Sequence, residues 1–297
     1  MNNLVKHNIE TEAANLIKIG LLGSESSQVQ YKTNINCWQH WTNDNGMEVN
    51  KTSLILFFTW LKEKGRSKST IKCYAFNIQR YFMLNQKIDL TATIEVKACL
   101  KGIYNSVSGK QKQAQSIESF EKVQEILALI TEDRYRLMFA LMFYGAMRSS
   151  EVRNLKYENL IFETDRVIIN LSNSKTNQKG NDEIKVIPKL NKGVCPYSML
   201  RELRDKDEHI NSITGYIFVT KNNTRIGFNQ MLKMFRKFFG KDYSTHSCRA
   251  TFITESIEKG ASYEHIKRQT GHKSDVMIEC YNRKKKSIKS NSVNLFI

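Results

Sequence analysis

Proline is scarce in this chain: Pro188 and Pro196 are the only two among 297 residues, so Gly and Asn must supply most of the turns. Paired cysteines are also absent, because none of the six cysteines belongs to a C-x-x-C motif. A structural zinc or a disulfide framework is therefore not expected, and the thiols are predicted to stay reduced. They are Cys37, Cys73, Cys99, Cys195, Cys248 and Cys280.

Long apolar runs are missing as well. No stretch approaches the roughly 18 apolar residues of a membrane-spanning helix, and the N-terminal MNNLVKHNIETEAA lacks the apolar core of a signal peptide. These absences predict a soluble intracellular chain with no membrane partner. The pattern G-x-x-x-x-G-K-[ST] is absent too, which excludes a P-loop energy source. No acidic cluster supplies the paired carboxylates of a two-metal site, so neither a metal nor another cofactor is expected.

Acidic residues are outnumbered: 29 Asp and Glu face 46 Lys and Arg, which gives a formal net charge of +17. Such an excess is the electrostatic signature of a protein that binds a polyanion. Hydrophobic residues make up 40% of the chain, enough to bury sizeable cores, and its length suggests two domains.

Reactive side chains gather in the stretch from His246 to Tyr281. It contains a His-x-x-Arg pair (His246 and Arg249), a Gly-His ending at His272, and Tyr281 nine residues further on. Two imidazoles, a guanidinium and a phenol suit one task, the breaking and rejoining of a phosphodiester through a tyrosyl phosphate. Because a phenol has a pKa near 10, it attacks only a phosphate that neighbouring cations have polarised.

A second arginine and a proton donor are then sought upstream. Arg148 follows an apolar helix, and Glu151 lies on the same helical side three residues later. The next segment, DRVIINLSNSKTNQKGNDEIKVIP, is typical of two strands, 167–171 and 183–187, joined by a turn that carries Lys175 and Lys179.

These motifs, in this order, resemble the tyrosine recombinases of the phage-integrase family. The resemblance implies the catalytic residues Arg148, Lys175, His246, Arg249, His272 and Tyr281, with Glu151 as a supporting acid. Lys175, in S-K-T, fits the family position better than Lys179. Two departures stand out: Cys248 and Ala250 flank Arg249, and Thr270 stands where Leu commonly precedes the Gly-His. No catalytic group is missing.

The resemblance also implies a mechanism. Both arginines would grip the scissile phosphate while His272 donates a hydrogen bond, Tyr281 forms a 3′-phosphotyrosyl link, and Lys175 protonates the leaving 5′ oxygen. His246 would accept the tyrosine proton or orient the phosphate, and Glu151 would hold His246 or an arginine. The expected partners are double-stranded DNA with specific recombination sites and further copies of the chain in a homo-tetramer. The expected location is on DNA, in the nucleoid or, for a viral protein, the host cell and its nucleus.

The predicted fold is mostly helical α+β, with a small helical core-binding (SAM-like) domain over residues 1–108. Apolar spacing predicts its helices near 28–43, 51–61, 68–85 and 93–104, with Asn50 as a cap. The resemblance implies DNA-backbone contacts from cations of this domain and of a basic linker, residues 109–118. They are Lys64, Arg66, Lys68, Lys72, Lys110 and Lys112.

Residues 119–297 are predicted to form a mixed α/β catalytic domain with a small β-hairpin and a C-terminal tail. Helices are expected over 120–130, 135–147, 197–206 and 229–239, and a short strand over 215–219. Two other functions stay open beside a site-specific recombinase. One is a type IB-like DNA topoisomerase, which uses a similar residue set. The other is a catalytically silent DNA-binding accessory protein.

Overall fold

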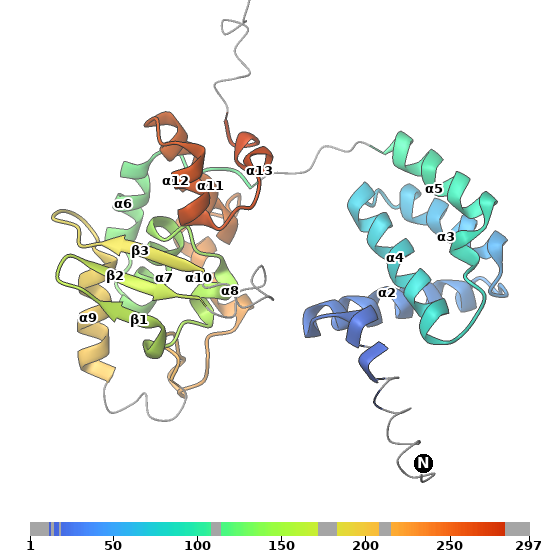
Figure 1. Ribbon diagram of the computed structural model, residues 1–297, viewed down its shortest axis with the longest axis horizontal. Coiled ribbons are helices and arrows are strands. Elements are labelled where there is room, and N and C mark those ends of the chain that lie inside the picture. The colour runs from blue at the N-terminus through green and yellow to red at the C-terminus, as the bar shows by residue number, and fades with distance from the viewer. Residues whose placement is uncertain are drawn as a thin grey trace, which may run out of the picture. The chain divides into compact units, whose positions relative to one another are not determined.

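The chain forms two compact units, residues 1–112 and 113–297, each with a hydrophobic core of its own (Figure 1). The computed structural model describes residues 12, 15–17, 19–107, 114–171, 183–207 and 215–282. The division falls inside the range 109–118 that was expected to be the linker. None of the described helices is long and apolar enough to cross a membrane.

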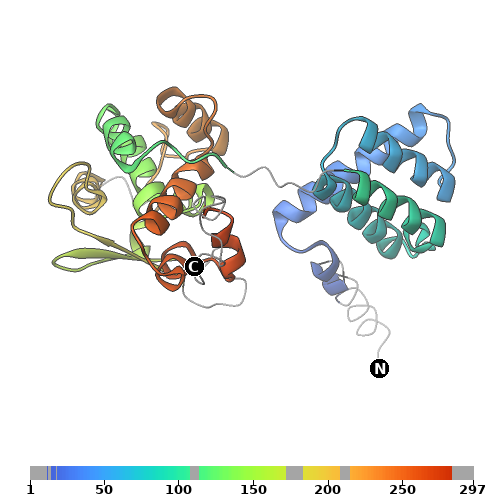
Figure 2. The same cartoon turned by 90° about the horizontal axis from the view of Figure 1, so that it is seen from above.

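The first unit is a small helical bundle (Figure 2). Asn50 caps one helix as predicted: its side chain accepts a hydrogen bond from the Ser53 N–H at 3.0 Å, and the Ser53 hydroxyl lies 3.0 Å from the Asn50 carbonyl oxygen. Trp38 is buried at the centre, with its ring edge-on to Tyr81 and Phe82. The elements are α2 (Glu25–Asp44), α3 (Lys51–Glu63), α4 (Lys68–Leu84), the 3₁₀ turn η1 (Leu90–Ala92) and α5 (Ile94–Ser106).

The second unit is α+β, as predicted, with mostly helical elements. They are α6 (Phe120–Ala128), α7 (Asp133–Tyr144), α8 (Ser149–Arg153), η2 (Tyr157–Asn159), β1 (Leu160–Phe162), β2 (Arg166–Asn170), β3 (Ile184–Pro188), α9 (Pro196–Asp207), α10 (Phe228–Phe239), α11 (Thr245–Glu258), α12 (Tyr263–Thr270) and α13 (Asp275–Glu279). Strand β1 was not predicted. The strand predicted over 215–219 was wrong, because only isolated bridges occur there: Tyr216 pairs with Lys156, and Val219 with Arg225.

Helix α7 is the centre of the second unit. Every residue from Leu137 to Phe143 is buried, so the helix is covered on all sides, as an apolar run requires. The three strands form an antiparallel sheet in the order β1-β2-β3 (Figure 1). In its register Val167 lies opposite Ile187, and Ile169 lies opposite Lys185. The last of these pairs places a lysine on the buried face.

Helices α11, α12 and α13 gather beside the β3 edge of the sheet (Figure 1), where α12 contacts β3 and α11 packs on α7. A small apolar cluster of Ile253, Ile266 and Ile278 joins one residue from each of the three helices, and Tyr281 packs against it. The end of α12 also meets the end of α7, because Gln269 Nε2 donates to the Tyr144 carbonyl at 3.2 Å.

Candidate active site

Arg148 is placed by a tight turn after α7. The helix ends at Tyr144, and a Cβ on Gly145 would lie 2.8 Å from the Leu141 carbonyl oxygen, so a side chain does not fit there. Ala146 has a φ of +46°, an uncommon conformation for a residue with a Cβ. This turn separates α7 from α8 and leaves Arg148 as the N-cap residue of α8.

Glu151 holds Arg148 at two points. One carboxylate oxygen accepts the Arg148 backbone N–H at 2.8 Å, and the other accepts Nη1 of its guanidinium at 2.5 Å. The Glu151 side chain is only 3% exposed. Of the two roles expected for this acid, the geometry therefore favours the one in which it orients an arginine, which is Arg148.

Arg249 lies on α11 and is buried. Its Nη1 donates to the Ala146 carbonyl at 2.7 Å, and its Nη2 donates to the Thr270 carbonyl at 2.5 Å. Burial, followed by the nearby charge of Arg148, lowers the pKa of Arg249 to about 10. Two cations thus face the same partly desolvated space, an arrangement that an anion would stabilise.

Both predicted histidines share this positive environment. Burial lowers the pKa of His246, and the charges of Arg249 and Arg148 lower it further. Burial lowers the pKa of His272 to about 4, with further contributions from Arg249, Arg148 and Lys185. Each imidazole is therefore neutral near pH 7 in the free protein.

Tyr281 follows α13 and packs against the apolar cluster of α11, α12 and α13. Burial raises the pKa of its phenol, while the charge of Arg249 acts in the opposite direction. The hydroxyl is therefore protonated near neutral pH and must lose its proton to become a nucleophile. Four separate segments thus place five predicted side chains close enough for charged neighbours to shift their pKa values or those of their partners. They are Arg148, His246, Arg249, His272 and Tyr281.

Two residues that the sequence analysis did not select belong to the same place. Lys185 has no exposed side-chain surface, and its Nζ lies 2.7 Å from both Glu183 Oε1 and the Gln269 carbonyl oxygen. Glu183 Oε1 is in turn 3.9 Å from Arg148 Nη1. Burial, the larger influence, lowers the pKa of Lys185, although Glu183 raises it. This pair fastens β3 to the end of α12.

The same Glu183 explains the glycine of the Gly-His motif. Gly271 ends α12 with a φ of +69°, and a Cβ there would lie 2.1 Å from Glu183 Oε1. Glycine is therefore required both by the backbone conformation and by the neighbouring carboxylate. The alternation of strand β3 did not reveal the network, because Lys185 shares its face with only one apolar residue of the strand, Ile187.

Several predicted residues lie outside the described part of the chain. They are Lys175 and Lys179 of the hairpin, Lys110 and Lys112 of the linker, and the tail from 283. The other predicted DNA-binding residues lie at the junction of α3 and α4, where Lys64, Arg66 and Lys72 are exposed. Lys68 Nζ and Lys72 Nζ lie 6.0 Å and 5.3 Å from the ring centre of Tyr104 on α5.

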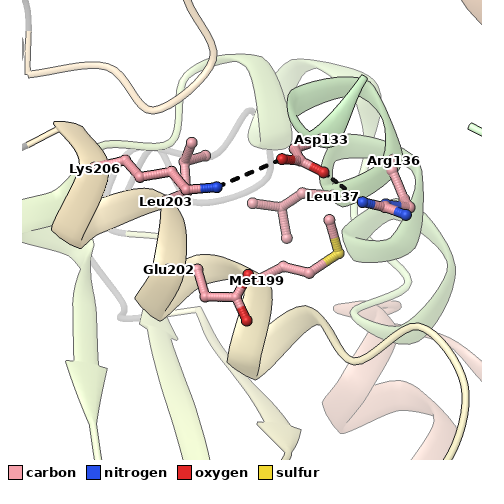
Figure 3. A pocket seen from close by; sticks show the side chains of 7 residues that line it. All are labelled: Asp133, Arg136, Leu137, Met199, Glu202, Leu203 and Lys206. Carbon is pink, nitrogen blue, oxygen red and sulfur yellow. Dashed lines mark hydrogen bonds and ion pairs between the residues drawn. The ribbon is translucent and has the colours of Figure 1, made fainter. Parts of the chain in front are cut away.

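A surface pocket between α7 and α9 is separate from these residues (Figure 3). Asp133 projects over it between Lys206 and Arg136, and the apolar side chains of Leu137 and Met199 form part of its lining. No catalytic candidate in the described part of the chain lines it. Among the described residues there is also no group of His, Cys, Asp and Glu that could hold a metal ion.

Comparisons with known proteins bear on the family and the fold of this chain. The phage integrase family profile matches residues 118–287. Tyrosine recombinase XerA of Pyrococcus horikoshii is 21% identical over 263 residues, which cover 75% of this chain and 86% of that protein. Among solved structures, the Tn1549 transposon integrase with transposon right end DNA is 14% identical with a TM-score of 0.62, over 91% of this chain and 93% of the other. A lambda integrase dimer on a COC′ core site is 13% identical with a TM-score of 0.63, over 95% and 78% of the two chains.

The two structural likenesses bear on the fold alone, and they agree with the mostly helical α+β architecture. The profile match is the stronger finding, because it covers more than half of the chain and spans every described residue of the candidate site from Arg148 to Tyr281. The chain therefore belongs to the phage integrase family of tyrosine site-specific recombinases.

Proposed function

We propose that this protein breaks and rejoins double-stranded DNA at specific sites through a covalent 3′-phosphotyrosyl intermediate, without a metal ion or ATP. The observation that carries the proposal is the convergence of four side chains on Arg249, which lies on α11. The other three are Arg148 after α7, His272 after α12 and Tyr281 after α13. Two related proteins of known structure are described in complex with DNA, and the net charge of +17 suits the same partner here.

The chemistry follows from these groups. Arg148 and Arg249 bind the non-bridging oxygens of the scissile phosphate and offset the negative charge that develops as it is attacked. Tyr281 forms the bond to phosphorus, and the 5′ oxygen leaves. Because its phenol is protonated, a base must take the proton, and neutral His246 is suited to this role. The tyrosyl phosphate keeps the energy of the broken bond, so a 5′-hydroxyl of another duplex can reverse the steps.

We further propose that Lys175 protonates the leaving oxygen. Lys175→Ala should cripple cleavage of ordinary DNA, and a bridging 5′-phosphorothiolate should restore it, because a thiolate leaves without a proton. Lys179→Ala is the matched control and should cleave both substrates like the natural protein. Rescue that follows Lys179 would transfer the role to that residue.

DNA contacts outside the active site are proposed for Lys64, Arg66, Lys68 and Lys72, and for the linker residues Lys110 and Lys112. The first four lie close together beside α4, where they would track a phosphate backbone. Replacing Lys64 and Arg66 with Gln should weaken binding to all sequences and make its log–log salt dependence shallower by about 0.9 per lost phosphate contact. An unchanged salt slope would remove these residues from the interface.

The working assembly is proposed to be a homo-tetramer on two DNA sites, located wherever that DNA lies, in the nucleoid or a host nucleus. Native gels with DNA of one and two sites would test it. A protein that exchanges strands as a monomer or dimer would contradict the proposal.

A single experiment tests the reaction itself. A suicide substrate nicked beside the scissile phosphate should trap a covalent protein–DNA adduct on a denaturing gel, in excess EDTA and without ATP. Tyr281→Phe should abolish the adduct while it keeps DNA affinity, because only the hydroxyl is lost. An undiminished adduct would refute the assignment, and a need for magnesium would indicate another reaction class. Relaxation of supercoiled plasmid without a target site would instead favour a topoisomerase.

A further inference from the structure

Thr270 occupies a buried position directly before Gly271 and His272. It ends α12, and its side chain has no exposure to solvent. Its hydroxyl donates to the Ile266 carbonyl one helical turn earlier, at 2.6 Å. A hydroxyl carries a single proton and a carbonyl oxygen can only accept, so this bond commits the Thr270 proton.

The next contact fixes the proton on His272. Its Nδ1 lies 2.9 Å from Thr270 Oγ1, which has no further proton to give. Nδ1 must therefore be the donor and carry the imidazole hydrogen.

The other ring nitrogen leads independently to the same tautomer. His272 Nε2 lies 3.3 Å from Nη2 of Arg249, and a guanidinium can only donate. Nε2 therefore accepts with its lone pair. Two neighbours on two helices, α12 and α11, thus select one arrangement: hydrogen on Nδ1, lone pair on Nε2.

We propose that Thr270 is a positioning residue that holds His272 as the Nδ1–H tautomer, so that Nε2 is a proton acceptor in the free enzyme and donates to the scissile phosphate only after taking up a proton from solution. In that step the Nε2 lone pair binds the proton, and the resulting imidazolium donates Nε2–H to a phosphate oxygen. Its Nδ1–H continues to donate to Thr270 Oγ1. The second half of this proposal rests on the proposed function, whereas the tautomer does not.

The charges around His272 explain why the proton arrives with the phosphate. Burial disfavours the imidazolium most. Arg249 on α11, Arg148 before α8 and Lys185 on β3 disfavour it further, and Glu183 before β3 favours it. The three cations outnumber the single acid around the ring. A bound phosphate adds negative charge among these groups, and the balance moves toward the protonated ring.

The test is the ¹⁵N spectrum of the full chain labelled at histidine, first without DNA at pH 7.5, with His272→Gln used for assignment. We expect His272 to show a protonated Nδ1 and a bare Nε2. Thr270→Ser and Thr270→Ala form a matched pair, since both lack the methyl group and only the hydroxyl distinguishes them. Thr270→Ser should keep the tautomer. In Thr270→Ala only Arg249 still favours it, so the Nε2–H form should become populated beside the Nδ1–H form. Thr270→Ala should also cleave roughly 10- to 100-fold more slowly than Thr270→Ser, by analogy with the loss of residues that orient metal-bound histidines.

DNA is then added to the Tyr281→Phe variant, which binds without reacting. Protonation of Nε2 on binding at pH 7.5 is expected, with proton uptake visible in weakly buffered solution. A hydrogen on Nε2 in the free protein, or an unchanged tautomer in Thr270→Ala, would overturn the role of Thr270 whether or not the protein recombines DNA. A bare Nε2 in the DNA complex would overturn the proton uptake, even if the covalent adduct forms normally.

Discussion

Replacing Lys185 with Met should destabilise the catalytic unit without affecting the N-terminal unit. The side chain keeps its length but loses the ammonium that lies 2.7 Å from both Glu183 Oε1 and the Gln269 carbonyl. Removing one member of a buried ion pair costs about 3–5 kcal/mol in unfolding free energy, because the remaining charge stays uncompensated. The Glu183 side chain is 13% exposed and its Oε1 lies 3.9 Å from Arg148 Nη1, so water and Arg148 partly compensate the charge of its carboxylate. We expect a loss of about 2–3 kcal/mol.

The measurement is calorimetry of the full chain combined with tryptophan fluorescence. All three tryptophans, Trp38, Trp41 and Trp60, lie in the N-terminal unit, so fluorescence follows that unit alone and is an internal control. For a unit of the size of residues 113–297, a loss of 2–3 kcal/mol corresponds to a fall of roughly 4–12 °C in its midpoint. The fluorescence midpoint should not move.

A second variant isolates the charge. In Glu183→Gln/Lys185→Met no buried carboxylate is left without its ammonium, so the double variant should lose less stability than Lys185→Met alone. The reasoning fails if the catalytic transition does not move in Lys185→Met, or if the double variant is as unstable as the single variant plus the separate cost of Glu183→Gln.

Two further results are expected. Because the pKa of His272 is about 4 in the folded protein against a usual 6.5, the unfolded chain binds more protons between these values, so the catalytic unit should lose stability as the pH falls from 6.5 to 4. His272→Gln should flatten this dependence in calorimetry at several pH values, and an unchanged slope would mean that the histidine is not buried as a neutral group. Gly271→Ala should cost more than Gly260→Ala in urea unfolding, since both residues have positive φ but only a Cβ at 271 meets Glu183. The control variant, Gly260→Ala, should lose about 1 kcal/mol of unfolding free energy. Equal losses in the two variants would contradict a close contact between Gly271 and Glu183.

The reactive side chains of the candidate site, and their order along the chain, can be read from the sequence alone. The resemblance to the family, carried by the types and order of the reactive side chains, predicted the site residues. They are Arg148, His246, Arg249, His272 and Tyr281. The main helices were also predictable, since apolar spacing and caps such as Asn50 are local signals. The predicted helix boundaries differed from the observed ones by a few residues at the majority of the ends, because capping and local packing determine where a helix stops.

The network around those groups was decided by tertiary structure. In IKVIP, Ile184 and Val186 lie on one face and Lys185 and Ile187 on the other, so the alternation does not place Lys185 inside. Pairing with β2 sets Lys185 opposite Ile169 on the inner face, beside α12. In the same way, Thr270 had the appearance of an ordinary departure from a family pattern, whereas its position makes it the acceptor for His272. Sequence patterns report which face of an element is apolar, but a hydrogen bond between distant segments depends on how those elements pack, and that information is spread over the whole core.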